Sequence, residues 1–517
     1  MFHRYLQQLV RTVITVHIHV QWDYYKIYFI VEWSKDASPV AVTPCNEPAG
    51  PQVPLPSDPL GLFSLFFDDT LVDLIVKETN RYAEQTLQGT DKEWSTDAAE
   101  IRAYMGFMIL MGINHLPEIR DYWSTNEYLH YAPIADRISR DRFEQITRYL
   151  HFTDNDSLPS RGEEGYSRLP KVDPVINHLK DKFKSVYYPH CEVSIDEARI
   201  PFKGRSSMKQ YLPLKPVKRS FKVWAMSDAT NGYMCDFDVY TGATDGRVVA
   251  LGGKVVLSSD SIMGRHHQLF FDNYFTSVNL LSTLLSKGTY ACGTIRTNRK
   301  QYPAEISEEV KKSSRGESAF HQCGNLVATA WKDNKVVNIA STLADPADHT
   351  TITRRQKDGT QLDVQCPLCV ALYNKYMGGV DLGDQLRGSY HVRLKNRKLQ
   401  VHFLFLDVAI TNSYILRSYY VTTAAMDHKS FRMMLAKQFI GDYMNRKRPG
   451  RPRKRSRPTP HLPSHSKSKR CVYCWNVHFA PRRKESVWIC TACEGHPQLC
   501  LTGWDDRSDY FRLWHEQ

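Results

Sequence analysis

The spacing of hydrophobic residues is helical in the first third of the chain, after an irregular start. Between residues 60 and 190, apolar side chains recur every three or four positions, which is typical of amphipathic helices. One helix should open at Asp97, where Glu100 stands three residues on as in a capping box. Another should follow Ser139, with Phe143 and Ile146 on one face. The pattern predicts an all-α N-terminal lobe over residues 59–190.

From Val193 onward the pattern is that of strands alternating with helices. The segment Ala229–Gly232 has the composition of a hairpin turn. Helices are expected over 248–257 and 276–286. Strands are expected over 193–200, 221–227, 233–240, 268–271 and 289–295. The predicted order is therefore β-β-β-α-β-α-β, an α/β fold with a mixed sheet and flanking helices.

Two segments depart from this order. Residues 298–365 contain loops and a hairpin over 326–341 and predict a β-rich insertion, after which helical spacing resumes between 367 and 420. Cys366 and Cys369 flank Pro367, which indicates the start of a helix. Residues 1–58 end in a proline-rich stretch and predict an irregular leader, although Ile14 to Val20 alternate like a strand without an obvious partner.

Charge is concentrated near the C-terminus. The 517 residues include 68 Lys and Arg against 55 Asp and Glu, a net charge of +13. Residues 445–470 contain 11 Lys and Arg and no acid, which leaves only +2 for the rest of the chain. This local excess predicts a polyanionic partner. No apolar run approaches the 18 or so residues of a membrane span, so we expect no membrane partner.

The basic segment contains a motif suited to DNA. Gly450, Arg451 and Pro452 stand between the basic residues Arg448 and Arg453, an arrangement that resembles an AT-hook. Proline keeps the chain extended, glycine permits close approach, and arginine side chains enter the narrow minor groove of A·T-rich DNA. The same segment also fits a nuclear-import signal, so residues 445–470 predict a DNA-binding linker and a nuclear protein.

Cysteine pairs follow this linker with the spacing of zinc ligands. They predict a small zinc module over residues 471–517 in a reducing compartment. One zinc ion needs four ligands, so seven candidates leave the number of ions open between one and two. Such a module could bind DNA or, as the competing idea, a protein such as a histone. The candidate Zn²⁺ ligands are Cys471, Cys474, Cys490, Cys493, His496, Cys500 and His515.

Three aspartates stand out by their positions in the predicted order. Asp196 lies in the first strand, Asp272 directly follows the buried strand 268–271, and Asp381 lies near the start of a later helix. A single aspartate at a strand end is usually a turn or cap residue. Together, three such carboxylates form a set of hard ligands for Mg²⁺ or Mn²⁺, and a two-ion site of this kind supports phosphoryl displacement. With the βββαβαβ order, they predict a ribonuclease-H-like catalytic core.

Basic residues follow the first strand of this core. Lys203, Arg205 and Lys215 belong to a run of cations that would hold DNA phosphates beside Asp196. The alternative is a solvated, lysine-rich hairpin without a ligand.

The motifs around these residues resemble those of piggyBac transposases, and most closely the vertebrate piggyBac transposable element-derived proteins. The resemblance extends from about residue 58 to residue 514. The motifs are Ser194-Ile195-Asp196-Glu197, Phe202-Lys203-Gly204-Arg205, Phe271-Asp272-Asn273-Tyr274-Phe275, and Tyr373-Asn374-Lys375-Tyr376-Met377-Gly378-Gly379-Val380-Asp381 with Asp384-Gln385.

The resemblance implies a function and a division of the chain. The family's catalytic aspartates correspond to Asp196, Asp272 and Asp381, with Asp384 as a nearby fourth. Residues 59–190 would serve dimerisation and DNA binding, residues 191–297 and 366–444 would form the core, and residues 298–365 would be the insertion. The terminal module would bind transposon ends. The implied activity is metal-dependent cleavage and strand transfer of double-stranded DNA at TTAA sites by a homodimer.

One departure keeps an alternative open. Family members usually carry a tryptophan shortly before the helix that begins near Leu399, whereas this chain has Arg397-Lys398 there. The alternative function is that of a catalytically inactive, domesticated transposase that acts as a DNA-binding or chromatin-associated protein.

Overall fold

A computed structural model describes most of the chain, which divides into two compact units, Met1–Tyr443 and Met444–Gln517. The described residues are 20–23, 26–29, 31–202, 204, 206, 208–213, 218–242, 251–258, 261–391, 400–420, 426–446, 463–472, 485–491, 493–495, 497–499, 501, 514 and 515.

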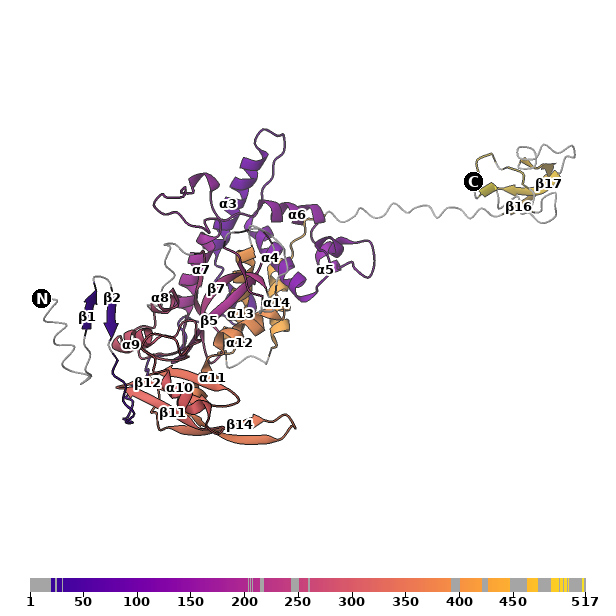
Figure 1. Ribbon diagram of the computed structural model, residues 1–517. Coiled ribbons are helices and arrows are strands. Elements are labelled where there is room, and N and C mark those ends of the chain that lie inside the picture. Colours follow the sequence, from indigo (N-terminus) through magenta and orange to yellow (C-terminus); the bar gives the residue numbers. More distant parts are fainter. Residues whose placement is uncertain are drawn as a thin grey trace. The chain divides into compact units, whose positions relative to one another are not determined.

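A nine-stranded mixed sheet forms the centre of the first unit (Figure 1). Five of its strands make a ribonuclease-H-like arrangement, in which three antiparallel strands are followed by two that run parallel to the first. Every one of these strands lies within two residues of its predicted bounds, so the predicted mixed sheet is confirmed. Across the sheet they are β8 (Met234–Val239), β7 (Arg219–Asp228), β5 (Glu192–Pro201), β9 (Gln268–Phe271) and β10 (Tyr290–Thr294). The short strand β6 (Gln210–Tyr211) also pairs with β7.

The segment predicted as an insertion continues the central sheet. β13 (Val336–Ser341) pairs with β10, and β12 (Leu326–Lys332) and β11 (Ser318–Cys323) follow outward from it. α10 (Glu305–Lys311) packs on these strands. The sequence predicted the hairpin of β12 and β13 but not its attachment to β10, because a period of two specifies the faces of a strand and not its neighbour.

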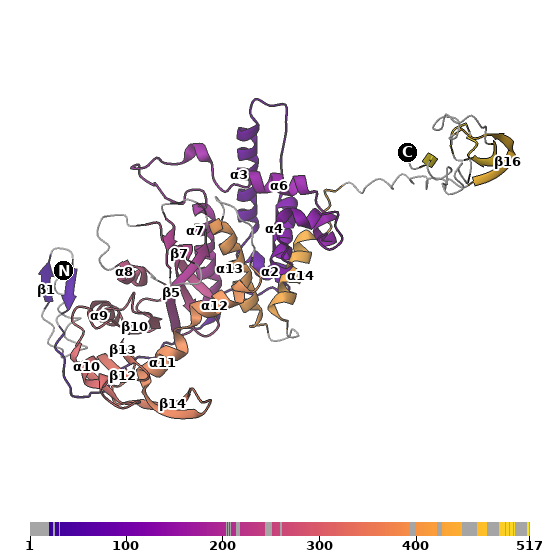
Figure 2. The same cartoon turned by 45° about the vertical axis from the view of Figure 1, so that its right-hand side comes forward.

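A second hairpin leaves this region. Its strands, β14 (His349–Arg355) and β15 (Gln361–Pro367), form a separate two-stranded sheet. Figure 2 shows β14 at the opposite end of the unit from α3 (Asp69–Leu87). As predicted for Cys366 and Cys369, a helix begins directly after Pro367.

Four helices connect or cover the core strands. α12 (Gly379–Gly388) packs on β5 and β7, and α11 (Leu368–Tyr376) packs on β10 and β13. The other two are α8 (Leu251–Leu257) and α9 (Val278–Ser286). The turn between β7 and β8 lies where it was predicted, and Gly232 adopts a φ of 79° there, a left-handed conformation that favours glycine.

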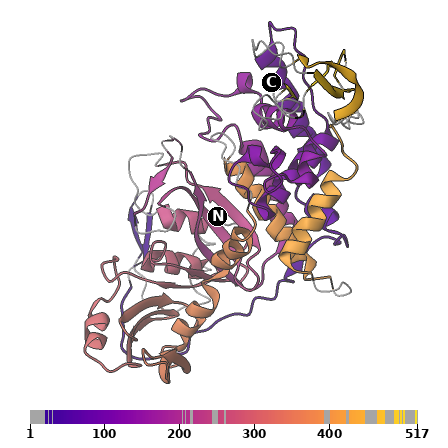
Figure 3. The ribbon, with the colours of Figure 1, turned by 90° about the vertical axis from the view of Figure 1, so that its right-hand side faces the viewer.

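Residues 59–186 are helical, as their periodicity predicts. The helices share one hydrophobic core with the central sheet, so they lie against it and not apart from it. Figure 3 shows these segments, in purple, gathered beside the orange helices that follow the core. Besides α3, they are α2 (Pro59–Ser64), α4 (Ala98–Ile113), α5 (Ala132–Ala135), α6 (Arg140–Tyr149), α7 (Asp173–Val186) and the 3-10 turns Ile119–Trp123 and Asn155–Ser157. A separate all-α lobe with the bounds given above remains a prediction.

Both predicted helix starts are confirmed, but Glu100 has another role. The Asp97 side chain accepts from the Glu100 amide at 2.8 Å and so caps α4. The Glu100 carboxylate does not complete a capping box. It is buried and accepts hydrogen bonds from Thr96, Tyr443 and the Arg142 guanidinium of α6. Glu100 therefore joins two helices to the last residue of the unit.

A buried ion pair joins the two helices that follow the core. Arg432 of α14 (His428–Ile440) donates to Asp407 of α13 (Gln400–Arg417) at 2.8 Å, and their side chains are 0% and 3% exposed. Arg432 also donates to the Tyr390 carbonyl at 2.7 Å and to His428. Burial, reinforced by the Arg432 charge, lowers the pKa of His428 to about 3, so this imidazole is neutral.

The segment before the helices is a strap held on the sheet. Ser34 forms an antiparallel bridge with Gln322 of β11, and the Thr43 amide donates to the Tyr290 hydroxyl at 2.8 Å. Further along, β3 (Gly50–Pro51) pairs with β4 (Tyr187–Tyr188). Residues 31–51, which we call the strap, therefore have fixed neighbours although they contain no helix. The hairpin of β1 (Val20–Asp23) and β2 (Lys26–Phe29) precedes them, and residues 14–19 lie outside the described residues.

The second unit contains a small antiparallel sheet. β16 (Pro463–Arg470) pairs with β17 (Glu485–Cys490), and Cys471, Cys490 and Leu499 are buried together beside it. In neither unit do the described helices include one with the length and apolarity that a membrane crossing requires.

We expect Glu100→Gln to lower the free energy of unfolding by about 3 kcal/mol at pH 7, because it leaves the Arg142 charge without its buried partner. Burial works to raise the pKa of Glu100, but hydrogen bonds from Arg142, Tyr443 and Thr96 outweigh it and lower the pKa. The carboxylate therefore stabilises the fold above its unfolded pKa of about 4.3, and this contribution is lost as the pH falls through the lower folded value. Urea unfolding at pH 7 and pH 4 measures the difference, which should shrink at pH 4.

Glu84→Gln is the matched control for this variant. Glu84 is an exposed glutamate of α3. A loss of stability equal to that of Glu100→Gln would contradict the assignment.

Candidate active site and metal centre

Three parallel strands bring predicted site residues together, at the carboxyl ends of β9 and β10 and in the middle of β5. In the sheet, Phe271 of β9 stands beside Ile195 of β5 on one side and Gly293 of β10 on the other. The residues that follow these three are Asp272 directly after β9, Asp196 within β5 and Thr294 at the end of β10. Two of the three predicted aspartates are therefore neighbours on adjacent strands. We call the place where β9 ends beside the middle of β5, with Asp196 and Asp272, the acidic edge.

Both carboxylates of the acidic edge are half-buried, and their pKa values are raised. Burial raises the pKa of Asp196 to about 6; the hydrogen bond from the Glu197 amide opposes the rise, and the charges of Asp272 and Asp381 add to it. Burial also raises the pKa of Asp272, against a hydrogen bond of 2.8 Å from the Tyr274 amide. Negative charges gathered in this way are stabilised by a bound cation.

The third aspartate comes from a helix that is fixed to β5. Asp381 is exposed and lies in the first turn of α12. The amide of its neighbour Val380 donates to the buried Ser194 hydroxyl of β5 at 3.1 Å. Gly379 makes this approach possible, since a Cβ atom there would lie 2.5 Å from the Ser194 oxygen and 2.8 Å from the Ala229 Cα.

The three carboxylates do not form a tight cluster. In the part of the chain that the structure describes, one group of three His, Cys, Asp or Glu side chains has all its ligand atoms within 4.8 Å, and it does not include these aspartates. Asp384, the predicted fourth residue, accepts from Arg387 of its own helix at 2.8 Å. Its supporting role remains a prediction.

Two arginines that the sequence reasoning did not select lie beside the acidic edge. Arg296 donates to the Asn273 side chain at 2.9 Å, and Arg299 donates to the carbonyls of Asn273 and Tyr274 at 2.7 and 2.8 Å. Neither forms an ion pair among the described residues. Burial and the nearby Arg296 charge lower the pKa of Arg299. Their position just after the predicted strand 289–295, which neighbours the strand of Asp272, was the signal that could have identified them.

The predicted DNA-binding residues fall outside the described residues. These are Lys203, Arg205 and Lys215 after β5, and Arg448, Gly450, Arg451, Pro452 and Arg453 of the hook. Among the neighbouring cations, Lys222 of β7 is buried and forms an ion pair with Glu197, with the Tyr274 ring 3.9 Å from its ammonium group. This lysine has a structural partner and is not a free phosphate ligand.

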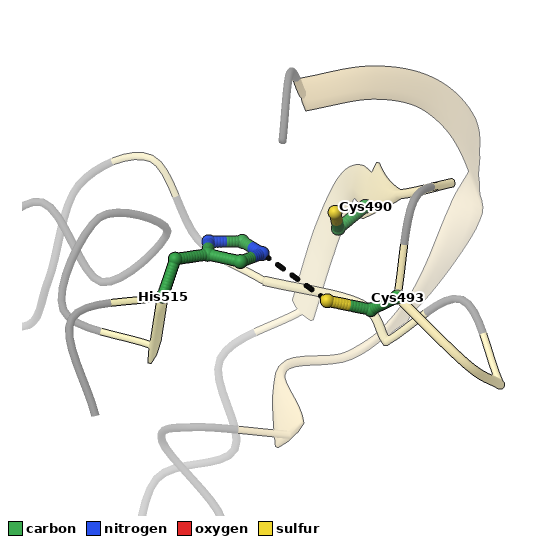
Figure 4. A group of neighbouring side chains, drawn as sticks. All are labelled: Cys490, Cys493 and His515. Carbon is green, nitrogen blue, oxygen red and sulfur yellow. Dashed lines mark hydrogen bonds between the residues drawn. The ribbon is translucent and has the colours of Figure 1, made fainter. Parts of the chain in front are cut away.

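The second unit brings three side chains of metal-binding type together. Cys490, Cys493 and His515 are the three side chains whose ligand atoms all lie within 4.8 Å of one another. Figure 4 shows the His515 ring turned toward Cys493, with Nε2 3.4 Å from Sγ. Cys471 is buried in the same small core as Cys490, whereas Cys474, His496 and Cys500 lie outside the described residues. Thiolate and imidazole groups at these positions could supply three of the four ligands of a tetrahedral ion.

Comparisons with known proteins agree with this geometry. The family model described as Transposase IS4 matches residues 58–414. Human PiggyBac transposable element-derived protein 2 is 33% identical over 392 residues, which cover 73% of this chain and 64% of that protein. Human PiggyBac transposable element-derived protein 3 is 28% identical over 458 residues, which cover 84% of this chain and 74% of that protein. The chain thus spans slightly less than two thirds of the first of these relatives.

A solved structure has the same fold. It is a cryo-EM structure of a piggyBac transposase synaptic complex with hairpin DNA, with a TM-score of 0.66 and 26% sequence identity. The similarity covers 77% of this chain and 84% of the other. The mixed sheet and its flanking helices are therefore an architecture that this chain shares with that transposase.

We expect Gly379→Ala to destabilise the first unit by about 1–3 kcal/mol, because the added methyl group meets Ser194 and backbone atoms that cannot turn away. The adjacent Gly378→Ala is a matched control, since nothing lies within 4 Å of a Cβ atom at Gly378. It should leave stability within about 0.5 kcal/mol of the original protein. Thermal unfolding of both variants measures the effect, and equal losses would contradict the close approach of α12 to β5.

Proposed function

This chain belongs to the piggyBac-type transposase IS4 family, and from that membership we propose that it cleaves and joins DNA strands at TTAA sites with divalent metal ions. The observation that carries the proposal is the closeness of Asp196, in the middle of β5, to Asp272, directly after the end of the parallel strand β9. The helix of Asp381 is fixed to β5 through Ser194. This arrangement supports the proposed triad of three aspartates.

The acidic edge suits a hard cation. Asp196, Asp272 and Asp381 offer carboxylate oxygens, the ligands that Mg²⁺ and Mn²⁺ prefer. A positive ion would relieve the mutual repulsion that contributes to the raised pKa of Asp196. Bound ions would activate a water molecule or a 3′-hydroxyl and stabilise the leaving oxygen. Two ions about 3.5–4 Å apart would share the three carboxylates between them, so no single ion has to contact all three. This is consistent with carboxylate oxygens that do not all lie within 4.8 Å of one another.

The arginines beside the acidic edge support a nucleic-acid substrate. Arg296 and Arg299 carry charge that no carboxylate neutralises through an ion pair among the described residues. Hydrogen bonds to the loop of Asn273 and Tyr274 hold both guanidinium groups next to Asp272. Guanidinium groups placed in this way would hold DNA phosphates on either side of the reacting one.

Partners of the chain follow from its relatives. The similar solved structure is a synaptic complex with hairpin DNA, so we propose double-stranded DNA with hairpin intermediates as the substrate. The resemblance of the sequence motifs to those of piggyBac transposases supports a homodimer as the working form. The AT-hook-like segment 445–470 would add salt-dependent affinity for DNA. The terminal module would hold Zn²⁺ and contact the transposon ends, and the basic segment would bring the protein to the nucleus.

We expect Asp272→Asn to reduce cleavage of a TTAA-flanked DNA duplex at least about a hundredfold in Mg²⁺ or Mn²⁺. A neutral amide binds the metal ion more weakly than a carboxylate does, and the ion is what stabilises the charge on the leaving oxygen. Gel analysis of end-labelled DNA measures the rate. Asp73→Asn, a change at an exposed aspartate of α3, is the control and should cleave normally. Equal rates for Asp272→Asn and the original protein would exclude the proposed site.

The alternative function is DNA binding without cleavage. The observation in its favour is the pair Arg397-Lys398 at the place where relatives usually carry tryptophan, together with the spread of the three carboxylates. In that case the intact protein would bind the duplex in Mg²⁺ and Mn²⁺ but leave both strands uncut, and Asp272→Asn would bind it equally well.

The zinc proposal gives a separate prediction. We expect the purified protein to contain at least one zinc ion per chain, and Cys493→Ser to lose about one, because replacing a thiolate with a hydroxyl removes a strong ligand. Elemental analysis after dialysis counts the ions, and a chelator should remove them. Cys323→Ser, in β11 of the other unit, should keep the full content. Zinc content that is the same in both variants would contradict the site.

A further inference from the structure

Two hydroxyl groups complete the row of side chains at the acidic edge. Thr294 follows Gly293 in β10, and Gly293 is paired with Phe271, so Thr294 stands beside Asp272. The Tyr373 hydroxyl, from α11, lies 3.4 Å from the Thr294 hydroxyl. Because α11 packs on β10 and on β5, it carries the phenol over the acidic edge, where its charge interactions are with Asp272 and Asp196.

The charges of both carboxylates act on the Tyr373 hydroxyl, although it forms no hydrogen bond with either of them among the described residues. Burial raises the pKa of Tyr373 to about 12; the contact with Thr294 opposes the rise, and the negative charges of Asp272 and Asp196 add to it. The hydroxyl is therefore protonated at neutral pH. Its one hydrogen-bond contact among the described residues is with Thr294. If Thr294 donates in this pair, the Tyr373 proton is free to point toward the acidic edge.

A neutral donor suits this place better than another charge. The carboxylates of the acidic edge are the proposed ligands of Mg²⁺ or Mn²⁺. A lysine or arginine at the position of Tyr373 would compete with these metal ions for the carboxylates. A phosphodiester held at the edge presents non-bridging oxygens whose charge has to be stabilised during displacement. A phenol supplies a hydrogen bond to such an oxygen without altering the charge of the site.

We propose that the Tyr373 hydroxyl donates a hydrogen bond to a non-bridging oxygen of the phosphodiester that is cleaved, and that Thr294 keeps the hydroxyl in place. Tyr373 is then a catalytic residue and Thr294 a positioning residue. The inference rests on the proposed function, because it requires a phosphodiester at the acidic edge.

The test separates binding of the metal from binding of the phosphodiester. Electron paramagnetic resonance of free Mn²⁺ gives the affinity for the metal alone. Phosphorus-31 relaxation of the dinucleotide TpT, titrated into the Mn²⁺-loaded full chain, gives the affinity for a phosphodiester next to the ion. Asp272→Asn identifies the relevant site, since it should abolish both signals there. Thermal unfolding confirms that each variant is folded.

We expect Tyr373→Phe to weaken TpT binding about tenfold, the usual effect of losing a hydrogen bond to a charged group, and to leave Mn²⁺ affinity within about twofold. Thr294→Val keeps the shape of its side chain and should weaken TpT binding by a smaller factor. Tyr376→Phe is the matched control: this tyrosine lies in the same helix, packs on Phe270, and should leave both affinities unchanged.

Three results would overturn the inference, and they can be told apart. Unchanged TpT affinity in Tyr373→Phe, with Mn²⁺ bound normally, refutes the phosphate contact and leaves the proposed function standing. A parallel loss of Mn²⁺ affinity would show that the phenol orients a carboxylate and not the substrate. No Mn²⁺ bound by the original protein at the site defined by Asp272→Asn would remove both the proposed function and this inference.

Discussion

The site depends on the parallel register of two strands. Ile195 and Phe271 stand side by side, so the residues that follow them, Asp196 and Asp272, must also meet. A shift of one residue would turn one side chain to the opposite face of the sheet and separate the carboxylates. The buried strand residues around them, Ile195 and Phe271 among them, fix the register because their side chains fill the core. Hydrophobic packing thus holds together two charges that repel each other.

The same packing extends outward from the acidic edge. Ser194 lies two residues before Asp196 and ties α12 to β5, while β10 on the other side of β9 carries Thr294 and leads to the two arginines. Buried pairs such as Arg432 with Asp407 then fix the helices that follow the core. Buried charged groups such as Glu100, Lys222 and Arg432 form ion pairs, whereas Arg296 and Arg299, beside the acidic edge, form none in the described part of the chain. The two unpaired positive charges favour the proposed polyanionic substrate.

Local features of the sequence predicted much of this arrangement. The bounds of β5 and β9, the cap at Asp97 and the turn at Gly232 depend on residues close in the chain, and the structure has them where they were expected. Partners distant in the chain were not predictable from periodicity. The pairing of β13 with β10, the contact of Tyr373 with Thr294 and the three donors around Glu100 all join segments that a hydrophobic pattern does not relate to one another. The three aspartates were selected from local features: Asp196 lies in the first predicted strand, Asp272 follows a buried strand, and Asp381 lies near the start of a helix.

The strap has a consequence for the outer edge of the large sheet. β11 is the outermost strand of the large sheet, and an outer strand offers unpaired amide and carbonyl groups to any other chain. Ser34 satisfies two of these groups at Gln322, and the Gln322 and Asn325 side chains bind the strap at Ser38 and Ala41. The strap therefore covers part of an edge at which another chain could pair, and a fragment that begins at the first long helix would expose that part to edge-to-edge aggregation.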